Sequence, residues 1–153
     1  MRSVWNLALG ILFVAGVCIA FTPAIRLPRR RGADIKNAMS FPLPGVAQRL
    51  ADQTGAPLQE AERREWFFRR WFVVVASCDV MIGMSSAQVD EYWHLLLDES
   101  ELYRAYSLAV CGRVIRHIEG AGGPKLEARS WVAYEEVWGT PPAADLWPRP
   151  PER

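Results

Sequence analysis

The two histidines of the chain, His94 and His117, are the residues best suited to chemistry. Asp90 lies four positions before His94, a spacing that places both side chains on one face of a helix. If the next helix packs antiparallel to this one, His117 at its far end returns toward Asp90. A carboxylate and two imidazoles suit Zn²⁺, and the thiol of Cys111 could join them. One hypothesis is therefore a zinc site at Asp90, His94 and His117.

Two other interpretations compete with the zinc site. In the first, the cluster only holds a helix pair in register, since Asp90 favours the positive end of a helix dipole and protonated His117 favours the negative end. In the second, Cys111 acts with His94 or His117 as its base in a thiol-dependent or hydrolytic enzyme. Neither Cys-x-x-Cys nor His-Glu-x-x-His occurs, and the GAGG stretch lacks the Lys-Ser/Thr of a phosphate-binding loop. We therefore expect no catalytic residue and no cofactor besides that zinc.

Hydrophobic periodicity predicts that helices position these residues. The stretch from Pro57 to Cys78 carries apolar residues at three- and four-residue steps and ends in WFVVVASC, which is apolar on every side. That end suits a buried helix or a buried strand, and we favour the helix. Its EWFFRRWF segment fits core packing better than a membrane surface. Ser85 or Ser86 would cap the following helix, and Ser85 with Gln88 fits a capping box. The other expected helices span residues 45–54, 85–97, 99–117 and 124–138.

The N-terminal segment predicts one transmembrane helix. Residues 3–25 carry no charged side chain, and about 20 apolar residues span a bilayer core. Trp5 occupies the position of an interfacial anchor, and the segment is followed by Arg26, Arg29, Arg30 and Arg31. The positive-inside rule then predicts a single-pass protein of the inner (plasma) membrane with its C-terminal part in the cytoplasm. The alternatives are a cleaved signal peptide, which the arginines disfavour, and a buried soluble helix.

The expected fold class is all-α, with one N-terminal transmembrane helix followed by a small helical bundle. The expected divisions are a transmembrane helix (1–25), a basic proline-rich juxtamembrane linker (26–44), a helical domain (45–139) and a proline-rich tail (140–153). Trp147 could hold the tail against the domain. The net charge of +1 argues against a nucleic-acid partner, and three cysteines without paired spacing argue against a disulfide framework.

The segment from Met84 to His117 also resembles, in its pattern of residues, the segment found in a known protein family. Its pattern consists of Met84, Ser86, Val89, Asp90, Trp93, His94, Leu97, Tyr103, Cys111, Gly112, Arg113 and His117. The tail adds Trp138, Gly139, Pro141, Pro142, Trp147 and Pro148. In these residues the chain resembles, over roughly positions 57–148, the glycine-rich-domain-containing-protein-like family, in its branch of small uncharacterised bacterial proteins.

The resemblance implies a motif and no assigned activity. Its structural motif would comprise Asp90, Trp93, His94, Tyr103, Gly112, Arg113 and His117. Many members of the family carry a second histidine two residues after the first, where this chain has Leu96. A metal or catalytic role built on that His-x-His pair therefore cannot operate here.

Taken together, these patterns favour a non-catalytic accessory or scaffold subunit of an integral membrane protein complex. The transmembrane helix would anchor the chain in the lipid bilayer, and the helical domain would dock onto partner proteins. The first alternative is a membrane-anchored domain that binds a metal or small ligand at Asp90, His94 and His117. The second alternative is the enzyme that uses Cys111.

Overall fold

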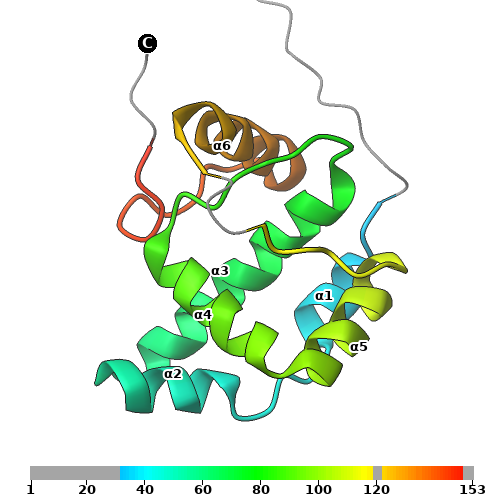
Figure 1. The fold of residues 1–153 in the computed structure, drawn as a ribbon. Coiled ribbons are helices and arrows are strands. Elements are labelled where there is room, and N and C mark those ends of the chain that lie inside the picture. Colours follow the sequence, from blue (N-terminus) through cyan, green and yellow to red (C-terminus); the bar gives the residue numbers. More distant parts are fainter. Residues whose placement is uncertain (1–31, 119–121, 150–153) are drawn as a thin grey trace, which may run out of the picture.

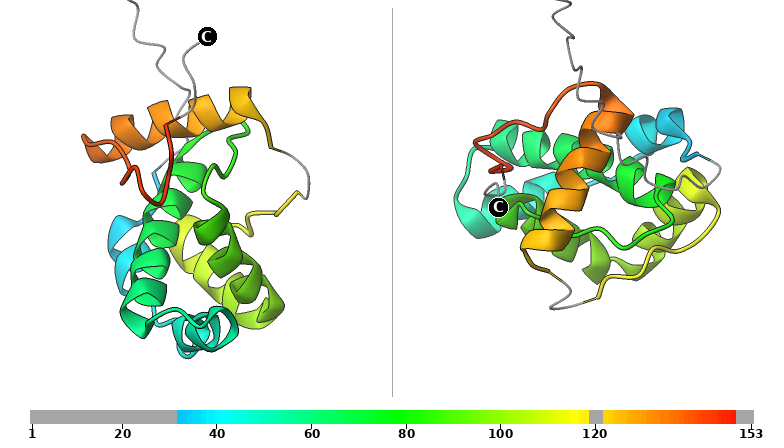
Figure 2. Two further views of the ribbon diagram at one scale, coloured as in Figure 1. Left: turned by 90° about the vertical axis from the view of Figure 1, so that its left-hand side faces the viewer. Right: turned by 90° about the horizontal axis from the view of Figure 1, so that it is seen from above.

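The computed structural model describes residues 32–118 and 122–149, and every regular element within these ranges is a helix (Figure 1). This confirms the all-α expectation for that part of the chain. The helices are α1 (Ile35–Ser40), α2 (Val46–Thr54), α3 (Leu58–Ser77), α4 (Ala87–Asp98), α5 (Ser100–Cys111) and α6 (Pro124–Trp138). In two further views, α6 lies across one end of the bundle and α2 across the other (Figure 2).

The described residues hold no helix that is long and apolar enough to cross a membrane. The predicted transmembrane segment, residues 1–25, lies outside them, as do Trp5, Arg26 and the arginines at 29–31. The membrane anchor and the orientation derived from it therefore stay predictions.

Helix α3 lies at the centre of the fold and contacts each of the other helices. Its apolar C-terminal end is helical as favoured, and it ends at Ser77. Phe68, Trp71 and Phe72 are almost fully buried, and the Phe68 ring contacts those of Trp71 and Phe72, with centroids 6.4 and 5.7 Å away. The aromatic residues of this helix therefore serve mainly as core, although Trp66 stays 42% exposed.

Helix α1 lies within the segment that the sequence pattern indicated to be a linker. The Asp34 side chain caps it by accepting a hydrogen bond from the Asn37 amide. The Asp34 amide donates to the Val110 carbonyl over 2.8 Å, and the Asn37 side chain donates to the Ala109 carbonyl over 3.0 Å. These bonds attach α1 to the end of α5. With six residues and one buried side chain, Ala38, the helix has no periodicity to detect.

The expected helix over residues 99–117 is confirmed as far as Cys111 and is wrong over residues 112–117. Helix α5 ends at Cys111 because Gly112 adopts a left-handed conformation (φ 69°) and donates its amide to the Leu108 carbonyl. Glycine reaches this conformation without the steric cost that other residues meet. Residues 114–118 then continue without regular structure, so His117 lies on this segment rather than on a helix.

The tail returns to the domain through Trp147, as expected. Trp147 is fully buried, and its ring lies 5.7 Å from that of Tyr134 on α6. Arg63 of α3 forms a 2.8 Å ion pair with Asp145, and the bonded guanidinium lowers the pKa of that exposed carboxyl. The proline-rich tail is therefore part of the folded domain as far as residue 149.

We expect Trp147→Ala to destabilise the fold by about 3–5 kcal/mol, the usual cost of removing a fully buried large aromatic side chain. Urea unfolding of the full chain in a mild detergent would measure the loss. Trp66→Ala, at the half-exposed tryptophan, is the matched control and should cost clearly less. Equal losses for the two variants would contradict the anchoring role of Trp147.

Candidate metal centre

Helix α4 presents Asp90 and His94 from one face. Its start is fixed by Ser86, whose hydroxyl accepts a hydrogen bond from the Val89 amide at 3.2 Å. Ser86 is therefore the cap, and the alternative Ser85–Gln88 capping box is not the one used. Burial of the opposite side, which includes Val89, Tyr92 and Leu96, turns the Asp90–His94 side toward the molecular surface.

His117 is positioned by anchors on the segment that follows α5. The Tyr103 hydroxyl donates to the Ile115 carbonyl over 2.7 Å, and the Ile115 amide donates to the Ser107 hydroxyl over 3.1 Å. Both partners belong to α5 and are buried. Burial alternates along this segment, since Ile115 is buried and His117 is half-buried, whereas Val114 and Arg116 are exposed. The His117 ring packs against the Trp93 ring in an edge-to-face arrangement, with ring centroids 4.5 Å apart.

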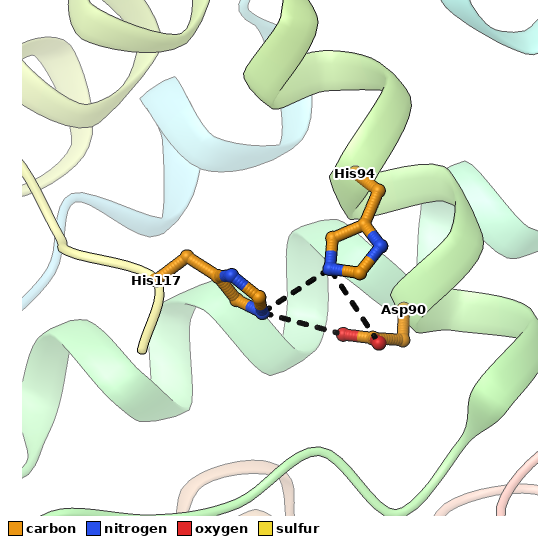
Figure 3. Close-up of side chains that lie close together, drawn as sticks. All are labelled: Asp90, His94 and His117. Carbon is orange, nitrogen blue, oxygen red and sulfur yellow. Dashed lines mark hydrogen bonds and ion pairs between the residues drawn. The ribbon is translucent and has the colours of Figure 1, made fainter. Parts of the chain in front are cut away.

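The three predicted ligands meet in the structure, where their ligand atoms lie within 4.8 Å of one another (Figure 3). The Nε2 atoms of His94 and His117 are 3.3 Å apart. Asp90 places one oxygen 3.8 Å from His94 Nε2 and the other 4.0 Å from His117 Nε2. The His94 side chain is 52% exposed, whereas that of His117 is only 18% exposed. The cluster is thus open to solvent on the side of His94.

The spacing of the two imidazoles matches a tetrahedral metal site. Zn–N bonds of about 2.0 Å in tetrahedral geometry put two ligand nitrogens about 3.3 Å apart. That is the distance between His94 Nε2 and His117 Nε2. The Asp90 carboxylate lies farther away. Its two oxygens face different imidazoles, at 3.8 and 4.0 Å, and one oxygen must move toward both nitrogens to complete such a site.

Without a metal, the same geometry ties α4 to the segment after α5. One imidazole can hydrogen-bond the other, and a protonated imidazole can pair with Asp90. Exposed ion pairs of this kind contribute at most about 1 kcal/mol. The structural interpretation therefore assigns the cluster a weak contribution to stability.

Cys111 does not join the three ligands. Its thiol lies 3.2 Å from the carbonyl oxygens of both Ser107 and Arg113, either of which can accept its single proton, and it is absent from the group of close ligand atoms. A Cys111–histidine pair, which the enzyme hypothesis needs, is not among the contacts of the described residues. The other motif residues support the centre from nearby, since Trp93 packs on His117 and Tyr103 fixes the backbone at Ile115.

A cavity of about 410 Å³ adjoins the cluster and shares Asp90 and His117 with it. Its apolar lining includes Trp71, Val75, Val80, Ile82, Met84 and Ile115. The loop between α3 and α4 is held in place at Gly83, whose carbonyl accepts hydrogen bonds from Trp71 Nε1 and from the Ser130 hydroxyl. A Cβ atom at Gly83 would lie 3.1 Å from that of Leu126, so α6 packs closely on this loop.

Sequence reasoning missed this cavity, which Arg116 also lines. The lining comes from α3, the loop after α3, α4 and the segment after α5. No local pattern links these segments, so only the tertiary structure reveals that they meet.

No protein-family model matches the chain, and neither the curated proteins nor the solved structures include a match to it. The resemblance to the glycine-rich-domain-containing-protein-like family stays a prediction, and the case for function depends on the geometry of the site.

We expect Tyr103→Phe to release the segment that carries His117. The variant leaves the buried Ile115 carbonyl without its partner, which costs about 1–3 kcal/mol. Hydrogen exchange should show faster exchange at the amides of residues 114–118. Tyr134→Phe on α6 is the control and should leave these amides unchanged. Unaltered exchange in Tyr103→Phe would show that Ser107 alone anchors the segment.

Alkaline pH should weaken the fold through the same tyrosine. Burial raises the pKa of Tyr103 from 10.0 to about 12, because the folded state disfavours the phenolate. The folded state therefore holds this proton more tightly than the unfolded state does. The resulting stability is complete below pH 10 and is lost as the pH rises through about 12. Urea unfolding over this pH range should show a shallower decline in Tyr103→Phe than in the unmodified chain.

Proposed function

We propose that this protein binds one divalent transition-metal ion, with zinc as the preferred ion, through Asp90, His94 and His117. The observation that carries the proposal is the 3.3 Å separation of the two Nε2 atoms beside a carboxylate that faces both. Imidazole and carboxylate together suit zinc, whereas magnesium and calcium prefer sites built from oxygen ligands.

Three ligands also indicate the type of centre. Structural zinc sites are usually closed by four protein ligands, whereas catalytic sites hold three and leave a position for water or substrate. Within the described part of the chain, the potential metal ligands that lie close together are Asp90, His94 and His117. A metal ion held by them keeps a free position. The proposed centre is therefore of the open kind, able to bind an exogenous ligand.

This proposal corresponds to a membrane-anchored metal-binding domain, the first alternative derived from the sequence. The accessory-subunit hypothesis rests on a membrane anchor in residues 1–25, which lie outside the described part of the chain. The anchor, the location at the plasma membrane and the partner complex stay predictions. The metal proposal depends on none of them.

The test is zinc binding by the metal-free full chain, purified in a mild detergent and titrated by calorimetry. We expect one equivalent of zinc, and at least a tenfold weaker affinity in His94→Ala, His117→Ala and Asp90→Asn, a loss of about 1.4 kcal/mol or more. Asp98→Asn, an exposed carboxylate on the same helix, and Cys111→Ser should bind zinc as the unmodified chain does.

Two outcomes would contradict the proposal. In the first, the folded chain binds no zinc. In the second, zinc binds equally well to His94→Ala and His117→Ala, which places the ion elsewhere. A thermal shift provides an independent measure, since zinc at a hundred times its dissociation constant should stabilise the fold by about 2.7 kcal/mol. Asp90→Asn, at a tenfold weaker affinity, should lose about half of that shift or more.

A further inference from the structure

We propose that the cavity beside the metal centre binds a phosphate monoester with an apolar organic group, whose phosphate is held by Arg113, Arg116 and the metal ion. This inference rests on the proposed function, because it assigns the ligand of the free metal position. It also stands on features of the cavity that are independent of the metal: its size, its apolar wall and its two arginines.

The cavity has the dimensions and lining of a small-molecule site. Its volume of about 410 Å³ falls within the range of about 300–1,000 Å³ typical of ligand pockets. Trp71, Ile82 and Ile115 are buried residues of its wall, and Val75 and Met84 are half-buried. Such a wall favours an apolar group and disfavours a bare inorganic ion.

The cavity also carries two guanidinium groups with no partner among the described residues. Arg113 is half-buried and Arg116 is exposed, and both line the cavity. By contrast, Arg49, Arg64 and Arg69 all form ion pairs with glutamates. Guanidinium groups bind phosphate oxygens with paired, charge-assisted hydrogen bonds. The two free arginines therefore supply anion recognition at the cavity.

The charge of the site favours phosphate over carboxylate. The lining contains the acidic residues Asp79 and Asp90, of which Asp79 is exposed and has an interaction of its own. The two arginines and a divalent ion together carry four positive charges, and the two carboxylates carry two negative charges. A phosphate monoester dianion neutralises the remaining two positive charges. A carboxylate ligand would leave part of that charge uncompensated.

The position of the cavity places such a ligand within reach of the metal. Asp90 and His117 belong both to the cavity lining and to the ligand set. Trp93 lines the cavity too, and its ring contacts His117. A phosphate bound by the arginines therefore lies beside the open metal position, and its arrival should alter both the metal spectrum and tryptophan fluorescence.

The test uses the full chain in a mild detergent, loaded with Co²⁺ as a coloured substitute for zinc, and phenyl phosphate as the probe. Calorimetry and tryptophan fluorescence report binding of the probe, and the Co²⁺ absorption spectrum reports the metal. We expect phenyl phosphate to bind and to change the Co²⁺ spectrum. Benzoate should bind at least tenfold more weakly, because it lacks the second negative charge.

The variants separate the cavity from the metal centre. Arg113→Gln combined with Arg116→Gln should weaken phenyl phosphate at least tenfold and leave Co²⁺ affinity within about twofold. Arg104→Gln, an exposed arginine of α5 outside the cavity lining, is the matched control and should change neither. Circular dichroism would verify that all variants keep their helices.

The outcomes distinguish the inference from the proposed function. If Co²⁺ binds but phenyl phosphate does not, or if the double arginine variant binds phenyl phosphate unchanged, the inference is overturned and the metal centre stands. Benzoate that binds as tightly as phenyl phosphate overturns the phosphate assignment. If Co²⁺ fails to bind while the arginines still bind phenyl phosphate, the proposed metal centre is overturned. The proposal that the metal ion helps to bind the phosphate is overturned with it.

Discussion

The rest of the structure depends on the need to cover α3 on every side. From Trp71 to Ala76 this helix is apolar around its whole circumference, and nearly all of it is buried. No single partner helix can shield such a surface, and α3 therefore contacts all the other helices. The rings of Phe68 and Phe72 pack on Tyr106 of α5, while Trp71 packs on Trp93 of α4. Packing on α3 thus places α4 and α5, which between them position Asp90, His94 and the segment of His117.

Buried polar groups refine this arrangement. Arg69 of α3 is 7% exposed, yet it pairs with Glu65 at 2.6 Å and donates to the Ala38 carbonyl at the end of α1. Charge-assisted bonds in a buried position are strong when every partner is present, and costly when one is lost. On the neighbouring face of α3, the Arg70 guanidinium lies between Trp66 and Trp138, 4.5 and 4.3 Å from their ring centroids. The two arginines thus attach α1 and α6 to neighbouring faces of α3.

The sequence predicts the structure well where the signals are local. Periodicity located α3 and α4, and the terminal glycines at Gly55 and Gly139 marked the ends of α2 and α6. The Asp90–His94 pair followed from a four-residue spacing. The approach of His117 to Asp90 was predicted from a wrong premise, a helix that continues without a break to residue 117. The left-handed turn at Gly112 ends that helix, and a single glycine within an apolar pattern is the only sequence signal for it. Helix α1 and the cavity depend on contacts between distant segments, which no local pattern carries.

The separation of the two histidines along the chain would make a bound ion a cross-link between distant parts of the sequence. His94 and His117 are 23 residues apart, with the whole of α5 between them, yet their ring nitrogens meet. An ion that joins them closes a loop and acts as a cross-link, much as a disulfide does. Closing a loop of this size removes conformational freedom from the unfolded chain equivalent to roughly 3 kcal/mol. A reversible ion would then be the bond that limits unfolding of this region.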